Sequence, residues 1–239
     1  MTARRFHTMD ADLARAEECD EELEKDMARY TGPKCRYCRA ERSKLFLKGE
    51  RCHSGKCPLN DIKNAGLPGK DPHARAKKPT NYGLQMREKQ KLKRTYCMLE
   101  KQFKLTFEEA ARIPGKTGET LISLLECRLD NVVFRLHFAS SRNQSAQFIN
   151  HGHILVNGKS VRIPSYQLKA GDVVSVAPSG QKMVAIKENL KEYSKSGVTP
   201  WLQLDPDAMK GTFVAVPRRS EVTELEKINE QLIVELYSK

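Results

Sequence analysis

The sequence lacks any long apolar run: no window approaches the 18 apolar residues that a membrane-spanning helix requires. Its first residues are rich in acids and contain no apolar segment of the kind found in secretory signals. Cysteine is scarce, at 7 of 239 residues, and nothing in the chain indicates the oxidising compartment that disulfides need. We therefore expect no membrane span, and the hydrophobic content of 39% is sufficient for one or two domains with a core.

Signatures of catalysis are also missing. The stretch IPGKTGET contains Gly-Lys-Thr, but a phosphate-binding P-loop requires glycine where this chain has Ala110. We interpret the stretch as a turn between helices, with Thr117 or Gly118 near the next N-cap, and exclude an ATPase. No Ser-His-Asp or paired-carboxylate pattern can be picked out, although a sequence alone does not exclude one assembled in space.

Positive charge is abundant and unevenly distributed. The chain has a net charge of +12, and residues 27–118 alone carry 23 basic and 8 acidic residues, a net charge of +15. Residues 1–26 are acidic, with nine acids and four bases. A positive excess of this size in one segment favours a polyanionic partner over a merely solvated surface, and nucleic acid is the usual polyanion.

Four of the cysteines form two pairs within 23 residues. Cys35 and Cys38 are separated by two residues, Cys52 and Cys57 by four, and the pairs by 13. Two such pairs can place four sulfurs around one tetrahedral ion, so we predict a structural Zn²⁺ site with no open position for substrate. Reduced thiols without metal are the next interpretation. The adjacent His53 is an alternative ligand, but four cysteines suffice.

The periodicity beyond residue 80 predicts helices followed by strands. From about Tyr82 to residue 103 we expect one long helix, with an apolar stripe that contains Leu92 and Phe103. Cys97 and Cys127 fall in helical patterns and are expected in the core. One or two helices should follow from residue 119, and then a short helix capped by Ser140 or Ser141.

A β-hairpin is expected around Asn157-Gly158, the dipeptide typical of a type I′ turn. Ile154 and Val156 should face inward, opposite Val161 and Ile163, and GDVVSVA should form a further strand. We also expect a C-terminal helix that docks on the first domain. His151 and His153 flank Gly152 and are interpreted as turn residues and not as a metal pair.

Several stretches of the chain, taken together, resemble one protein family. They are MARYTGPKC, KLFLKGERC, REKQKLKRTY, LLECRLDNVVFRL, HGHILVNGK, IPSY and NEQLIVELYSK. The chain resembles the bacterial small-subunit ribosomal protein number four, the S-four family, in its zinc-bearing, four-cysteine type, from Met27 to Lys239. The resemblance implies an α+β fold. A mostly helical N-terminal domain (28–117) carries the zinc knuckle and is completed by 199–239, and residues 118–198 form a small RNA-binding module with a twisted antiparallel sheet, plus a linker.

The function that the resemblance implies is structural and not enzymatic. Family members bind small-subunit ribosomal RNA at a helix junction of the 5′ domain and nucleate assembly. They line the channel by which messenger RNA enters, beside the third and fifth small-subunit proteins, and contribute to decoding accuracy. We therefore expect a cytoplasmic, ribosome-associated protein. The alternative, an RNA-modifying enzyme that carries the same RNA-docking module, requires a catalytic domain for which no segment is left over.

The RNA contacts implied by the resemblance are dispersed, as the recognition of a folded junction by shape and phosphate requires. In the N-terminal part they are Arg29, Tyr30, Lys34, Lys48, Arg87, Lys91 and Arg94, and Arg75 and Lys78 match basic positions that face messenger RNA. In the small module they are Arg128, Asn131, Arg142, Gln144, His151, Asn157, Lys159 and Tyr166.

Three departures from the family pattern affect these expectations. The helix RNQSAQFIN carries Asn143, Ala146 and Asn150 where Arg or another polar group is common, so that face should bind more weakly. The usual Gly-Gln-His-Gly is replaced by GKDPHAR. Residues 1–27 form an acidic extension without a counterpart, or Met27 is the true start; we favour the second, because an acidic tail would oppose RNA docking.

Overall fold

The computed structural model describes residues 30, 32–60, 66–69, 78–226 and 228–238, and only the backbone of residues 192–196. The expected acidic extension lies outside the described residues. The chain divides into two compact units, Met1–Pro33 and Lys34–Lys239. The elements of the second unit are, in order, α2 (Lys34–Ala40), α3 (Glu50–His53), α4 (Asn81–Thr95), α5 (Glu100–Arg112), α6 (Thr117–Glu126), α7 (Leu129–Arg135), α8 (Arg142–Asn150), β1 (Ile154–Val156), β2 (Lys159–Ser160), β3 (Val173–Val176), α9 (Pro178–Gln181), α10 (Val184–Ser196), β4 (Leu202–Asp205), β5 (Lys210–Phe213), two 3₁₀ turns (η1, Arg219–Glu221; η2, Thr223–Leu225) and α11 (Glu230–Tyr237).

The long helix expected from Tyr82 is in fact two helices. Helix α4 ends at Thr95, where Cys97 adopts a left-handed φ of 55° and the amide of Met98 donates to the Lys93 carbonyl at 3.1 Å. This pairing closes a Schellman motif, which satisfies the last carbonyls of a helix and turns the chain. The prediction of one continuous helix was therefore wrong. Cys97 is exposed, so its expected place in the core was wrong as well, whereas Cys127 is buried.

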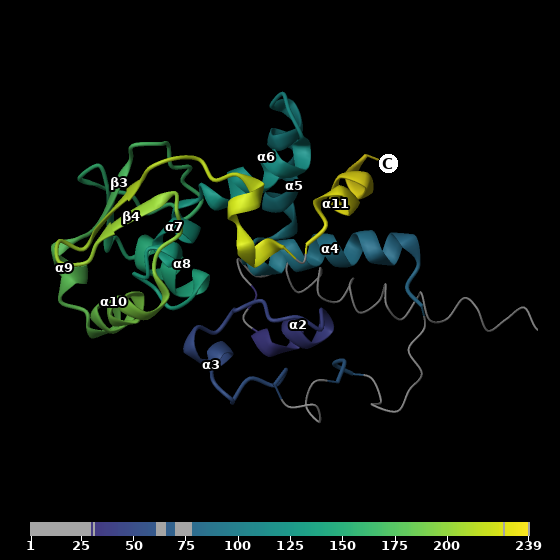
Figure 1. The fold of residues 1–239 in the computed structure, drawn as a ribbon, viewed down its shortest axis with the longest axis horizontal. Helices are drawn as coiled ribbons and strands as arrows, with labels where there is room; N and C mark the ends of the chain where they lie inside the picture. The colour runs from purple at the N-terminus through teal and green to yellow at the C-terminus, as the bar shows by residue number, and fades with distance from the viewer. Residues whose placement is uncertain (1–29, 31, 61–65, 70–77, 227, 239) are drawn as a thin grey trace, which may run out of the picture. The chain divides into compact units, whose positions relative to one another are not determined.

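Helices α4, α5, α6 and α11 form the helical part of the unit. The C-terminal helix α11 packs on α4 and α6, as expected for a tail that docks on the first domain (Figure 1). Its Tyr237 ring stacks on Phe107 of α5 at a centroid distance of 4.5 Å. The α5–α6 turn at residues 113–116 confirms the interpretation of Gly-Lys-Thr as a connection, with α6 starting at Thr117.

Helices α7 and α8 were both anticipated from the sequence. Ser141 caps α8 by accepting a hydrogen bond from the Gln144 amide at 3.4 Å, and Gln144 Oε1 accepts from the Ser140 amide at 2.7 Å. This reciprocal arrangement resembles a capping box and fixes where the helix begins. The amides of Leu129 and Asp130 at the start of α7 donate to carbonyls of the 164–166 loop, which attaches that loop to the helix.

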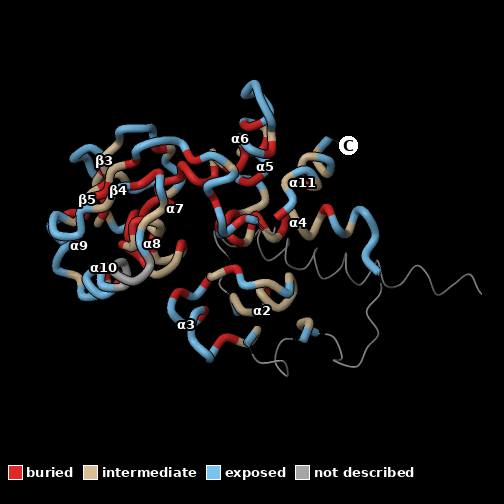
Figure 2. Tube along the Cα trace, viewed as in Figure 1, coloured by how far each residue is buried: buried red, intermediate tan, exposed pale blue. Residues whose placement is uncertain are grey.

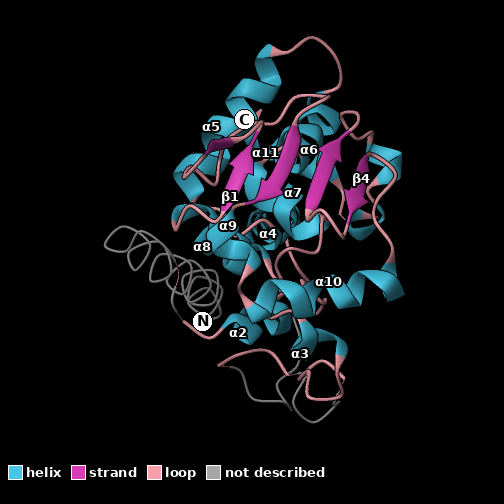
Figure 3. Ribbon diagram, turned by 90° about the vertical axis from the view of Figure 1, so that its left-hand side faces the viewer, coloured by secondary structure: helices cyan, strands magenta, loops and turns pink. Residues whose placement is uncertain are grey.

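The sheet has five antiparallel strands in the order β2-β1-β3-β5-β4, and Figure 3 shows them as one layer with α7 and α8 packed against it. Asn157 and Gly158 have φ values of 50° and 78°, which confirms the expected type I′ turn. Strand β2 contains only two residues, so the pairing does not reach Ile163, which is 60% exposed. The expectation that Ile163 faces inward was wrong.

Strands β4 and β5 come from the segment expected to complete the N-terminal domain. Val174 and Ser175 of β3 pair with Gly211 and Lys210 of β5, which places residues 202–213 in the sheet. Of the segment 199–239, η1 contacts α6, and α11 packs on both α4 and α6. One buried core runs from Leu92 in α4, through α5–α8 and the sheet, to Ile233 in α11, and Figure 2 marks buried stretches of these elements in red. No helix among the described residues has the length and apolarity needed to span a membrane.

Candidate nucleic-acid interface and cysteine segment

The four paired cysteines lie in a small segment that begins with α2 and ends at Cys57. Cys35 and Cys38 come from α2, Cys52 from α3, and Cys57 follows it; the last two are buried. The segment has a small apolar core of its own, to which Leu45 and Leu47 contribute. The amide of Lys48 donates to Cys52 Sγ at 3.3 Å, the kind of bond that stabilises a thiolate.

The cysteine thiols are close enough to affect one another's protonation. The pKa of the Cys38 thiol is raised to about 11, chiefly by burial and in smaller part by negative charge on Cys52, Cys35 and Cys57, while a backbone hydrogen bond at Leu45 lowers it. Four soft sulfur donors in one small segment are the donor set that zinc prefers. Within the part of the chain that the structure describes, however, no three His, Cys, Asp or Glu side chains converge on a position for a metal ion. The four sulfur atoms are thus the right donor type for zinc and lie in one small segment, but their positions do not converge on a single point at metal-ligand distances.

Basic residues of α4 join this segment to the helix through one carboxylate. Glu41 Oε1 lies 2.7 Å from Arg94 Nη1 and 3.5 Å from Arg87 Nη1. The guanidinium of Arg94 also stacks over the Tyr37 ring at 4.3 Å. Burial raises the pKa of Glu41 despite the two arginines. Arg94, predicted to contact RNA, is therefore mostly buried in an internal contact, whereas Arg87 retains 35% side-chain exposure.

The remaining predicted contacts of the N-terminal part differ in accessibility. Lys48 and Lys78 are exposed, and Tyr30 and Lys34 are half-buried. Lys91 pairs with Glu88 at 3.3 Å on the same helix. Arg29 and Arg75 lie outside the described residues.

Three of the predicted contacts of the small module lie at its surface. Lys159 is in the short strand β2, His151 follows α8, and Tyr166 is 40% exposed in the loop that caps α7. Arg162, in the segment between them, is also exposed. Two cations, an imidazole and an aromatic ring on exposed turns are groups that bind phosphates and stack on unpaired bases.

Two other predicted contacts maintain local structure. Gln144 closes the cap of α8 described above. Asn157 Nδ2 donates to Asp172 Oδ1 at 2.9 Å and its Oδ1 accepts from the Val173 amide at 2.9 Å, so the side chain fastens the hairpin turn to β3. Both side-chain amides have intramolecular hydrogen-bond partners, so a structural role is sufficient to explain why these residues stand at these positions.

Three further predicted contacts are buried among acids. Arg128 forms a two-point contact with Asp130, at 3.1 and 2.7 Å. Asn131 is fully buried and donates to Glu126 Oε2 at 2.7 Å. Arg142 is 5% exposed and its Nη2 lies 2.9 Å from Glu224 Oε2. These three side chains expose little surface and have acidic or amide partners within the protein, so the proposed interface leaves out Arg128, Asn131 and Arg142.

The sequence reasoning missed the acids and the arginine that complete this interior cluster: Glu126, Arg135 and Glu224. Burial alone would raise the pKa of Glu126, but the nearby Arg135 and Arg142 and the bonds it accepts hold it below its usual value. Glu224 has a pKa of about 2, because both arginines outweigh its burial. The sequence carried a signal for two of them, since Glu126 and Arg135 lie within otherwise apolar helical runs, whereas Glu224 lies in a polar stretch.

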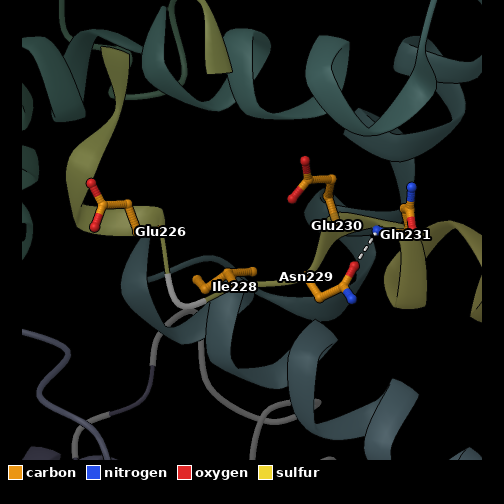
Figure 4. Close-up of a pocket in the computed structure, with 5 residues that line it drawn as sticks. All are labelled: Glu226, Ile228, Asn229, Glu230 and Gln231. Atoms are coloured by element: carbon orange, nitrogen blue, oxygen red, sulfur yellow. Dashed lines mark hydrogen bonds between the residues drawn. The ribbon is translucent and has the colours of Figure 1, made fainter. Parts of the chain in front are cut away.

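A shallow pocket lies at the start of α11, lined by Glu226, Ile228, Asn229, Glu230 and Gln231. Figure 4 shows Asn229, whose Oδ1 accepts a hydrogen bond from the Gln231 amide at 3.0 Å. The bond is an N-cap and the lining is acidic, so the pocket is a poor fit for a polyanion.

A helical part joined to a two-helix, antiparallel-sheet module with cations on exposed turns defines a class of RNA-binding proteins, and sequence comparison agrees. Residues 29–126 match the family model "Ribosomal protein S4/S9 N-terminal domain", and residues 127–174 match "S4 domain". The chain is 54% identical over 214 residues to the small ribosomal subunit protein uS4 of Thermoanaerobacter sp. (strain X514). It is 51% identical over 213 residues to those of Citrifermentans bemidjiense and Geobacter sulfurreducens. Each alignment covers 89% of this chain and 100% of the relative.

The chain belongs to the uS4 family of ribosomal proteins. The resemblance noted from the sequence is confirmed at the level of the family; its zinc-bearing type remains a prediction.

Proposed function

We propose that the chain is a structural constituent of the small ribosomal subunit that binds ribosomal RNA directly, in the cytoplasm. The observation that carries this function is the alignment with uS4 proteins over their full length at 51–54% identity. The relatives compared above are named as ribosomal proteins and not as enzymes, which supports a structural role. The charge distribution fits, since residues 27–118 carry a net charge of +15.

The RNA target is a helix junction in the 5′ domain of the small-subunit RNA, where the chain binds early and nucleates assembly. Dispersed cations suit such a target, because a folded junction is recognised by shape, phosphates and 2′-hydroxyls. The accessible candidates are Lys48, Lys78, Arg87, His151, Lys159 and Tyr166. By the same family relation we propose contact with messenger RNA where it enters the subunit, neighbours that include the third and fifth small-subunit proteins, and a contribution to decoding accuracy.

The purified protein is expected to bind a 5′-domain RNA fragment with an affinity that falls steeply with salt. Each neutralised phosphate releases counterions, so six to ten contacts should cost about 10³–10⁵-fold in affinity between 50 and 200 mM salt. Filter binding across a salt series measures this, with an unrelated duplex of the same length as the control. Equal affinity for the 5′-domain fragment and for the unrelated duplex at physiological salt would exclude specific recognition.

We also propose that Cys35, Cys38, Cys52 and Cys57 hold one structural Zn²⁺. The four thiols and the Lys48 amide bond to Cys52 support this, and a segment with so small a core gains stability from a metal that crosslinks it. Four protein ligands leave no open coordination position, so the ion would have no catalytic role.

Metal analysis of the purified protein should find one zinc per chain. Replacing Cys35 or Cys57 with serine is expected to abolish binding, because three thiolates hold the ion much less tightly. Cys97→Ser is the matched control, since Cys97 lies outside the set, and it should retain the ion. A folded wild-type protein free of zinc after purification with supplied zinc would refute the site.

A further inference from the structure

One polar cluster in the protein joins segments that are distant in the sequence. Glu126, at the end of α6, accepts hydrogen bonds from the Tyr96 hydroxyl (2.5 Å), from Asn131 Nδ2 (2.7 Å) and from Arg135 Nη2 (2.8 Å). Tyr96 follows α4, whereas Asn131 and Arg135 belong to α7. The carboxylate thus connects the helical part of the chain to the small module.

The same cluster reaches α8 and the C-terminal tail. Glu224, in the 3₁₀ turn η2, lies 2.9 Å from Arg142 Nη2 and 3.1 Å from Arg135 Nη2. The guanidinium of Arg142 is 5.0 Å from the Tyr96 ring centroid, and its Nε donates to Asn131 Oδ1 at 2.9 Å. Five segments therefore meet at two carboxylates and two guanidinium groups.

We propose that this cluster is an orientation lock, and that its residues Tyr96, Glu126, Arg135, Arg142 and Glu224 position the small module relative to α4 so that both RNA-binding surfaces match one RNA. Apolar packing also runs across this boundary, but apolar contacts are non-directional. The two-point contact of Arg135 with Glu126, at 3.2 and 2.8 Å, has a defined geometry, and the bonds from Arg135 and Arg142 to Glu224 add to the selection of one orientation.

The expected benefit concerns binding and depends on the proposed function. Two surfaces held rigidly bind one RNA without the entropy cost of ordering them first, whereas loosely joined surfaces incur that cost on binding. In this proposal Arg142 and Asn131 act on RNA through position and not through contact, which agrees with their burial.

Glu224→Gln is the variant that tests the lock. Glu224 retains 28% side-chain exposure, and glutamine keeps its shape while it removes the charge that neutralises both arginines. Glu221→Gln is the matched control: Glu221 lies three residues away, and its Oε2 accepts only a local bond from the Arg218 amide in the described contacts. Both substitutions raise the net charge by one, which by itself strengthens binding to RNA.

The two variants carry the same change in charge but should differ in RNA affinity. Glu221→Gln is expected to bind the 5′-domain fragment as tightly as the wild type or slightly more tightly, and Glu224→Gln about tenfold more weakly, equivalent to about 1.4 kcal/mol. The slope of affinity against salt should not change in Glu224→Gln, since the phosphates contacted in the complex stay the same. Glu224→Asp, which keeps the charge, should recover part of the loss.

Residual dipolar couplings of the free protein give a readout that does not require RNA. Amides of α4 and α5 and amides of α7, α8 and the sheet should fit one alignment tensor in the wild type and in Glu221→Gln, but two different tensors in Glu224→Gln. A single tensor in Glu224→Gln, or RNA affinity equal to that of Glu221→Gln, would overturn the lock. Failure of the wild type to bind RNA would refute the proposed function and leave the coupling experiment to decide the lock alone.

Discussion

Replacement of Glu126 with leucine is expected to lower the free energy of unfolding by about 3–5 kcal/mol, the usual cost of removing one partner from a buried charge cluster. The side chain is fully buried, and its carboxylate accepts bonds from Tyr96, Asn131 and Arg135. Leucine fills a similar volume but leaves the Arg135 guanidinium, only 9% exposed, with Glu224 as its remaining acidic partner among the described contacts.

The measurement is urea unfolding followed by the fluorescence of Trp201, the single tryptophan of the chain, which is buried and lies 5.9 Å from the Arg135 guanidinium. Glu119→Leu is the matched control, because it removes an acid from the same helix that is exposed and pairs only with the exposed Lys116 in the described contacts. That variant should unfold at nearly the wild-type urea concentration. A loss below about 1 kcal/mol in Glu126→Leu would mean that the cluster contributes little to stability.

The sequence predicted the local structure of the small module well, because that structure depends on local signals. Ser141 caps α8 and Asn157-Gly158 makes the turn of the hairpin, both from short-range chemistry that one segment contains. The position of Ile163 could not be read in the same way. How far a strand pairs depends on its partner, and β2 stops at Ser160.

The other two differences have separate causes, one local and one between distant segments. The break after Thr95 places a non-glycine residue, Cys97, at a left-handed φ, which glycine would have signalled and cysteine does not. The pairing of β5 with β3 joins segments that are separated by more than thirty residues of chain. A periodic pattern reports which face is buried, but not against which partner.

Charged residues pose the same problem for the candidate site. The sequence alone does not show whether the guanidinium of an arginine binds an RNA phosphate or a carboxylate of the protein. Arg142 and Arg128, both predicted to contact RNA, form ion pairs with Glu224 and Asp130, whereas Lys159 is exposed as an RNA contact requires. Net charge therefore indicated the class of partner correctly, while the choice of individual residues required the fold.

Adding a single methyl group at Gly211 is also expected to lower the free energy of unfolding substantially. It lies in β5 opposite Val174, and a Cβ there would come within 2.5 Å of Leu136 Cδ1 and closer still to Leu136 Cδ2. Leu136 is itself fully buried at the end of α7, so its side chain would have to shift against the packed core. Gly211→Ala should therefore cost about 1–3 kcal/mol through overpacking between the sheet and α7.

A double-mutant cycle separates this clash from a general preference for glycine. Leu136→Ala alone should cost about 2–5 kcal/mol by leaving a cavity, and in the double variant the methyl group introduced at position 211 occupies part of that cavity. The double variant should then lose less stability than the two single losses added together, by about 1 kcal/mol or more. Gly66→Ala is the control, since a Cβ at Gly66 meets no atom of the described residues within 4 Å, and it should leave stability unchanged. Strict additivity would show that Gly211 is required by the strand itself, and that close packing of the module's helix on its sheet has no part in it.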